Sequence, residues 1–165
     1  MKFFDLFKSK KSYSNTAKKK CDVKAKMIQY ESKMTARSIT KDSALIQSAI
    51  DRMIKEDPFK NYYTGKTDAD FGPMSKRVYK YDAVTTVNVN LVSPDDHSCL
   101  LYVEGISLGE IPDSEKEKID QYKENCLLTA YAYVTGGPYK EYSEAEQSVV
   151  ELEDPYGLDI YIQFT

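Results

Sequence analysis

The sequence predicts an α+β fold in which antiparallel strands make up most of the domain. Apolar and polar residues alternate from Val87 to Leu91 and from Leu158 to Phe164, the two-residue period of a half-buried strand. Residues 42–56 instead carry apolar side chains at helical spacing. Glu104-Gly105 joins two strand-like runs as a tight hairpin turn does, because glycine adopts the positive φ that such turns require.

Length and composition limit the chain to one domain and a tail. A chain of 165 residues is too short for two ordinary domains with separate cores. Hydrophobic residues make up 41% and charged residues 30%, as in soluble globular proteins, and no window approaches the roughly 18 consecutive apolar residues of a membrane span. Asp5 interrupts the apolar start, so no signal peptide is predicted. We expect a cytoplasmic protein with a single domain at residues 22–165.

The charge divides the chain into two parts. Residues 1–37 hold 11 basic and 3 acidic residues, a balance of +8, whereas the remainder holds 12 basic and 23 acidic residues, a balance of −11. Phe3, Leu6 and Phe7 share one helical face ahead of a lysine-rich run. Residues 1–21 are therefore either a basic flexible tail or an amphipathic start with a polybasic stretch. The second interpretation attaches residues 1–20 peripherally to an anionic membrane surface, to nucleic acid or to a protein partner.

The first half of the domain contains the best helix of the chain. Residues 22–39 fit strand and helix patterns equally well. A helix is predicted at 42–56, capped by Asp42 or Ser43 and ended at Asp57-Pro58, with its apolar face docked on the strands. A long connection rich in Gly, Asp and Pro follows, and long ordered loops often carry binding functions.

The second half is mostly strand. We predict strands at 78–81, 86–92, 100–103 and 106–111, with a polar loop at Ser93-Pro94-Asp95-Asp96. Ser114 to Glu117 has capping-box form, which predicts a helix to about Glu124 with Ile119 and Tyr122 on its inner face. The strand at 126–134 is expected to stop at Gly136-Gly137-Pro138, before a charged excursion at 140–146 and a final strand at 158–164.

Residues that carry enzyme chemistry are sparse. The only histidine, His97, lies beside Asp95, Asp96 and Cys99, but these lack the paired spacings of a zinc site. No phosphate-binding glycine motif is present. Cys99 and Cys126 lie in apolar runs and are interpreted as small core residues with free thiols. We therefore expect no enzyme activity, no cofactor and no metal.

Tyrosine is the unusual feature, with 14 residues and no tryptophan. Half-buried tyrosines on strands present ring faces to which nucleobases stack, and nearby basic residues follow a phosphate backbone. The opposing interpretation is that amphipathic tyrosines suit the wet face of any small barrel and that the −11 balance disfavours nucleic acid. The candidate rings are Tyr62, Tyr63, Tyr79, Tyr81, Tyr131 and Tyr133, and the candidate cations are Lys60, Lys66, Lys76, Arg77 and Lys80.

A longer pattern resembles the HIRAN domain and its stand-alone bacterial relatives, over about residues 57–165. In that family a valine- and leucine-rich strand leads into a Pro-Asp loop, an apolar strand, a glycine turn and a segment that opens a helix. The corresponding parts here are Val87 through Val92, Pro94-Asp95-Asp96, Leu100 through Val103, Gly105 and Gly109-Glu110-Ile111-Pro112. The chain departs from the family pattern at His97 to Cys99 and at Glu110.

The resemblance implies a small OB-like β-barrel with one crossing helix, and recognition of single-stranded DNA or DNA 3′ ends. Tyr62, Tyr63 and Gly65 match the family's Tyr-Tyr-Thr-Gly stretch, and Asp95 or Asp96 its acidic loop. Two functions follow from the sequence. The first is a non-enzymatic module that binds nucleic acid, and the alternative is a protein-interaction or accessory domain tethered through its N-terminus.

Overall fold

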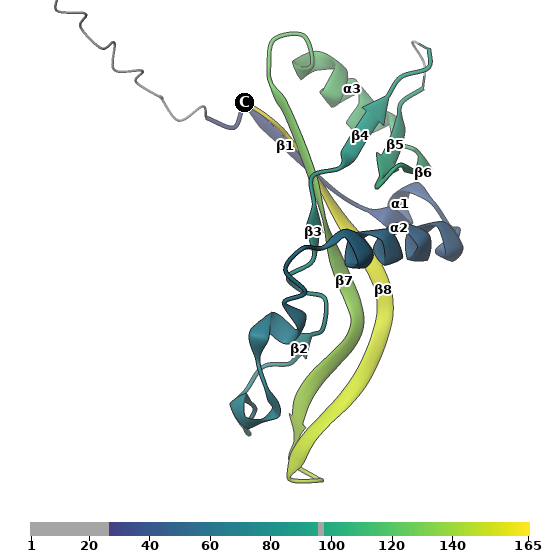
Figure 1. Cartoon of the computed structure of the whole chain (residues 1–165). Coiled ribbons are helices and arrows are strands. Elements are labelled where there is room, and N and C mark those ends of the chain that lie inside the picture. The colour runs from purple at the N-terminus through teal and green to yellow at the C-terminus, as the bar shows by residue number, and fades with distance from the viewer. Residues whose placement is uncertain (1–26, 96–97) are drawn as a thin grey trace, which may run out of the picture.

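Two antiparallel sheets and three α-helices form the domain in the computed structural model, which describes residues 27–95 and 98–165 (Figure 1). The predicted α+β class with mostly antiparallel strands is confirmed. The predictions made for residues 1–21, together with Asp96 and His97, lie outside the described residues.

The larger sheet is built around one long hairpin. Its strands are β7 (Leu128–Ser143) and β8 (Ser148–Phe164), which pair along almost their whole length. β1 (Tyr30–Thr35) pairs with the C-terminal half of β8, while β2 (Val78–Tyr79) and β3 (Thr85–Thr86) pair with the outer edge of β7. Figure 1 shows that the lower part of this hairpin extends well below helix α2.

The alternating pattern at the C-terminus produces β8 as predicted. Leu158, Ile160, Ile162 and Phe164 are all buried, as are Ala132 and Val134 of β7 opposite them. The predicted stop at Gly136-Gly137-Pro138 is wrong, because β7 continues to Ser143 through a register shift between Thr135 and Gly137. Both glycines have positive φ, so they form a bulge that bends the strand without ending it. The segment predicted as a charged excursion is therefore largely strand.

A second sheet contains β4 (Val89–Val92), β5 (Leu100–Val103) and β6 (Ile106–Glu110) in that order. Glu104 and Gly105 both have positive φ, which confirms the predicted tight hairpin. The predicted strand at 86–92 is interrupted, since Val87 lies between β3 and β4 and its side chain is 81% exposed. The predicted single strand is therefore two short strands, β3 in the larger sheet and β4 in the smaller sheet.

Helix α2 (Ser43–Glu56) matches its prediction closely. The Asp42 carboxylate accepts hydrogen bonds from the amides of Ala44 and Leu45, and the helix ends at Asp57. Its buried face contacts β8 and β6. A single-turn helix, α1 (Ala36–Ile39), connects β1 to this region, so residues 22–39 include both a strand and a helical turn.

Helix α3 (Asp113–Tyr122) has the expected inner face, with Ile119 buried and Tyr122 packed on the core. The predicted capping box at Ser114 is wrong. Pro112 is the N-cap residue, and no side chain caps the helix. Asp113 and Glu115 lie in the first turn, where acidic side chains stabilise the positive end of the helix dipole.

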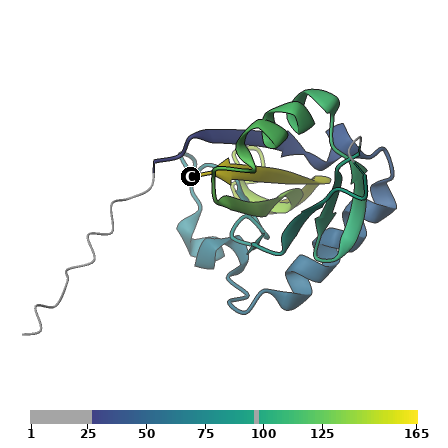
Figure 2. The same cartoon turned by 90° about the horizontal axis from the view of Figure 1, so that it is seen from above.

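The core lies between the two sheets and the helices, as the view from above shows (Figure 2). Within residues 27–95 and 98–165 the sheets are not closed into a barrel, because no strand of one sheet pairs with a strand of the other. Cys99 is buried in this core and Cys126 packs against it. No helix in the described part of the chain is long and apolar enough to cross a membrane.

The long connection between α2 and β2 is ordered by two 3₁₀ turns, η1 (Tyr62–Gly65) and η2 (Asp68–Asp70). Thr67 and Asp70 form a capping box, with the Asp70 carboxylate accepting from the Thr67 amide at 2.7 Å. That bond lowers the pKa of Asp70. The Lys140 ammonium donates to Asp68 at 2.7 Å and so ties η2 to β7.

Candidate functional site

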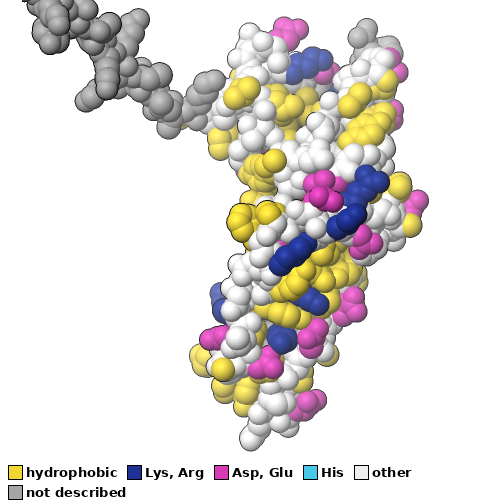
Figure 3. All heavy atoms as spheres, viewed as in Figure 1, with side chains coloured by type: hydrophobic (Ala, Val, Ile, Leu, Met, Phe, Trp, Pro, Cys, Tyr) yellow, Lys and Arg dark blue, Asp and Glu magenta, His cyan; other side chains and the backbone are white. Residues whose placement is uncertain are grey.

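Three tyrosine rings from separate parts of the chain meet beside the bulge of the long hairpin. Tyr62 of η1 lies edge-on to Tyr81, with ring centroids 5.5 Å apart and planes at 88°. Tyr81 in turn stacks on Tyr156 of β8, with centroids 6.3 Å apart and planes at 29°. We call Tyr62, Tyr81 and Tyr156 the bulge triad. On the face seen in Figure 3, hydrophobic side chains gather below α2, with Lys and Arg at their margins and Asp and Glu nearby.

A strained turn places Tyr62 at this position. Tyr63 and Thr64 both have φ near +50°, a region that non-glycine residues rarely adopt, and Gly65 follows at +77°. The Tyr63 amide donates to the carbonyl of Lys80 at 3.0 Å, which holds the turn against the segment that carries Tyr81. Such conformations persist only where surrounding contacts enforce them, and they cluster at binding sites.

Lys80 supplies the positive charge of the bulge triad. Its ammonium lies 5.6 Å from the Tyr62 ring centroid and 5.5 Å from that of Tyr81, within the range of a cation–π contact. In the part of the chain that the structure describes, no carboxylate lies within ion-pair distance of this ammonium. The lysine is therefore available to a phosphate.

Tyr156 forms the inner end of the triad. Burial raises the pKa of its hydroxyl to about 12, and the neighbouring Tyr81, Glu153 and Asp51 add to the rise. The glycines opposite leave room for its ring, since a Cβ on Gly137 would lie 2.4 Å from Tyr156 Cε1. The Gly-Gly bulge thus has a direct role in seating this ring.

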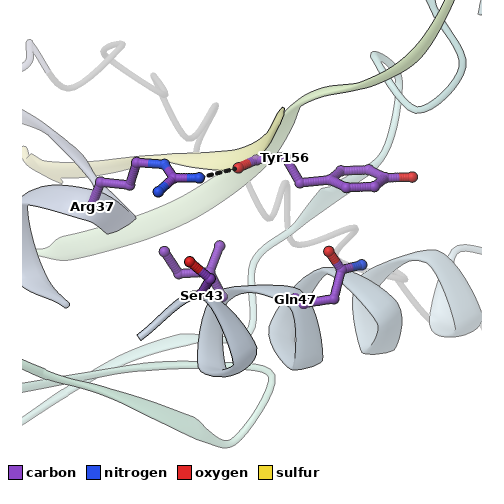
Figure 4. A pocket seen from close by; sticks show the side chains of 5 residues that line it. Arg37, Ser43, Gln47 and Tyr156 are labelled. Atoms are coloured by element: carbon purple, nitrogen blue, oxygen red, sulfur yellow. Dashed lines mark hydrogen bonds between the residues drawn. The ribbon is translucent and has the colours of Figure 1, made fainter. Parts of the chain in front are cut away.

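Two hollows open next to Tyr156, and the smaller of them lies between α2 and β8. The larger has a volume of about 220 Å³ and the smaller about 90 Å³, and both are lined by Arg37 and Tyr156. The Arg37 guanidinium donates to the Tyr156 carbonyl at 3.4 Å, as Figure 4 shows. The hollows therefore share a wall with the bulge triad.

The remaining predicted tyrosines lie elsewhere. Tyr63 is only 9% exposed, and its ring is covered by the Lys140 ammonium at 4.8 Å. Burial, together with nearby Glu151, raises its pKa. Tyr79 packs on Tyr139 with ring centroids 5.3 Å apart and donates to the Asp154 carboxylate at 2.5 Å. Neither ring contributes to the triad.

The predicted cations are also dispersed. The Lys60 ammonium donates to the Ile54 and Lys55 carbonyls at the end of α2. Lys66 lies over the Phe71 ring at 5.9 Å, and Lys76 is exposed in the loop before β2. Arg77 lies over the Tyr139 ring at 4.4 Å and forms ion pairs with Asp154 and Glu141.

Asp95 lies in the loop between β4 and β5, on the other sheet, where its carboxylate accepts from the Ser98 amide at 2.7 Å. Gly65 has the positive φ that the η1 turn needs. Among the described residues no group of three His, Cys, Asp or Glu side chains is placed to hold a metal ion.

A second group of rings lies on the solvent side of the larger sheet. Tyr131 and Tyr161 are cross-strand neighbours whose rings stack at 5.2 Å, and Tyr133 is edge-on to both. Lys33 lies over Tyr161 at 5.3 Å and forms an ion pair with Asp159 at 2.7 Å. We call Tyr131, Tyr133 and Tyr161 the sheet cluster.

Two residues of the site were not singled out from the sequence, Tyr156 and Arg37. The signal for Tyr156 is the Pro-Tyr-Gly stretch at 155–157, which lies at the bulge between the pairs Thr135–Gly157 and Gly137–Asp154. Arg37 is an exposed arginine in a four-residue helical turn, and nothing in the local sequence distinguishes it.

Comparison of the chain with protein-family models, curated proteins and solved structures found no match in any of the three. The functional conclusions below therefore rest on this site and on the sequence pattern.

Proposed function

We propose that this protein is a non-enzymatic, HIRAN-like module that binds single-stranded nucleic acid, with unpaired bases stacking on the bulge triad. The observation that carries the proposal is the meeting of Tyr62, Tyr81 and Tyr156 from three separate segments, with the Lys80 ammonium over two of the rings. Aromatic platforms with an adjacent cation bind single strands because every base has a face to stack.

The charge of the domain shapes this proposal. Residues 38–165 carry a balance of −11, so non-specific attraction to a phosphate backbone is weak. Ring stacking supplies most of the affinity, and Lys80 contributes a local contact. We also include the OB-like architecture in the proposal, with the two unclosed sheets as the halves of an open barrel.

The test is fluorescence anisotropy of the folded, full-length protein with a labelled single-stranded 12-mer at low salt. Tyr62→Leu weakens binding by about 1 to 3 kcal/mol, the contribution of one base stacked on one ring. Tyr133→Leu is the matched control, because Tyr133 is 38% exposed and Tyr62 is 36% exposed. A flat titration, or equal losses in the two variants, would refute the proposal.

A further inference from the structure

The two hollows beside Tyr156 have the chemistry of an anion site. Arg37 lines both, and hydroxyl groups of Thr35, Thr135 and Ser43 complete the polar part of the wall. Asp159 also lines the larger hollow, but its carboxylate is paired with the Lys33 ammonium at 2.7 Å. Figure 4 shows Arg37 and Tyr156 on one side of the hollow and Ser43 and Gln47 on the α2 side.

Arg37 is free to bind a ligand. Its guanidinium forms no ion pair with any carboxylate of the described residues, and the one hydrogen bond that the guanidinium makes to them is the 3.4 Å contact to the Tyr156 carbonyl. A guanidinium has five N–H donors in a planar fork that matches phosphate oxygens. The amides at the start of α2 are not needed, since Asp42 already occupies those of Ala44 and Leu45.

Tyr156 connects this hollow to the bulge triad. Its carbonyl accepts from Arg37, while its ring stacks on Tyr81, so one residue spans both features. The Arg37 hollow and the bulge triad therefore have Tyr156 in common.

The hollow suits the end of a strand better than its interior. It is bounded by β1 and α1, by the bulged part of β7 and β8, and in its smaller part by α2. A terminal phosphate monoester carries a charge of about −1.5 to −2 at neutral pH, more than the single charge of an internal diester. A lone guanidinium therefore gains more from the monoester.

We propose that the Arg37 hollow is a subsite for the terminal phosphate of a strand that stacks on the bulge triad, an inference that rests on the proposed function. The experiment compares three internally labelled 12-mers, one with hydroxyl groups at both ends, one with a 5′-phosphate and one with a 3′-phosphate. A phosphorylated strand binds about tenfold tighter than the hydroxyl-ended strand. The two phosphorylated strands show which end is read.

Arg37→Gln removes this preference, so that the three strands bind the variant with equal affinity. Arg52→Gln is the matched control, because Arg52 is also an exposed helical arginine that donates to one backbone carbonyl, that of Glu104 at 2.9 Å, and it lies outside both hollows. Circular dichroism establishes that both variants are folded.

Equal binding of the three strands overturns the phosphate subsite and leaves the proposed function intact. A preference that survives in Arg37→Gln has the same consequence. Failure of every strand to bind the folded wild-type protein overturns both proposals.

Discussion

The bulge triad and the sheet cluster are built from the same residue type, and they differ in how the rings are held. In the sheet cluster, Tyr131 and Tyr161 occupy paired positions of regular strands and stack face to face at 8°. In the bulge triad, each ring comes from a different segment, and irregular backbone at η1 and at the Gly-Gly bulge positions two of them. Tyr133 and Tyr62 are almost equally exposed, so the two groups differ in backbone regularity and in the hollow next to Tyr156.

The cations differ in the same way. Lys33 of the sheet cluster is paired with Asp159, whereas Lys80 of the bulge triad has no carboxylate partner in the described segments. An ammonium that is already paired gains little from a phosphate. Tyrosine content alone therefore does not define a site, and three variants are expected to distinguish the two groups of rings.

The largest effect is expected at the bulge. Gly137→Ala forces an alanine to adopt a φ of +79° and brings its Cβ to within 2.4 Å of Tyr156 Cε1. We expect the free energy of unfolding to fall by about 1 to 2 kcal/mol from the backbone strain, measured by urea denaturation. Strand binding weakens as well, because the Tyr156 ring is displaced.

Gly72→Ala is the control for this prediction. Gly72 has no positive φ, and a Cβ there meets nothing within 4 Å. We expect both its stability and its strand binding to match the wild type. A Gly137→Ala protein with unchanged stability would show that the bulge does not hold the ring.

A smaller effect on strand binding is expected to distinguish Lys80 of the bulge triad from Lys33 of the sheet cluster. Lys80→Gln weakens strand binding by about two- to fivefold, the contribution of a cation at an aromatic site. It also reduces the slope of log affinity against log salt by about 0.7, because one phosphate contact to a single strand is lost. Lys33→Gln changes neither quantity. If Lys33→Gln lowers the affinity as much, the sheet cluster belongs to the binding surface.

The smallest effect concerns alkaline pH. Burial raises the pKa of Tyr156 to about 12, so the folded state favours its neutral form. The stability from this group is complete below the unfolded pKa of about 10 and is lost as pH rises through 12. Tyr156→Phe therefore reduces the loss of stability between pH 10 and pH 12.

Tyr131→Phe provides the comparison for this titration. Burial raises the pKa of Tyr131 too, followed by the effect of Glu31, but the shift is smaller. We expect it to reduce the alkaline loss of stability less than Tyr156→Phe does, as measured by urea denaturation across this range. A larger effect from Tyr131→Phe would place the more desolvated hydroxyl in the sheet cluster.

Local pattern predicted much of the fold. The helix from Ser43, the hairpin at Glu104-Gly105 and the last strand each depend on neighbouring residues, whose spacing decides which face is buried. The prediction at Gly136-Gly137 was wrong because consecutive glycines suit a strand end and a bulge equally well. The bulge is distinguished from a strand end only by the structure, in which β7 pairs with β8 both before Thr135 and after Gly137.

The site was less predictable than the fold. The sequence identified Tyr62, Tyr81 and Lys80 as candidates, together with residues that lie elsewhere, such as Lys60 and Tyr79. The local sequence does not distinguish these candidates, since each is an amphipathic or charged residue in a loop or short strand. The structure separates them through contacts with distant segments, and it adds Tyr156 and Arg37.

By itself, the sequence determined the antiparallel α+β class, the core-facing residues of α2 and β8, and a surplus of tyrosine. The first two follow from hydrophobic periodicity, which acts over a few residues, and the third is a matter of composition. Only the tertiary structure decided that Tyr62, Tyr81 and Tyr156 share one surface beside Arg37. That meeting depends on how a bulged hairpin and a strained turn pack, and the free energy of such packing comes from residues far apart in the chain.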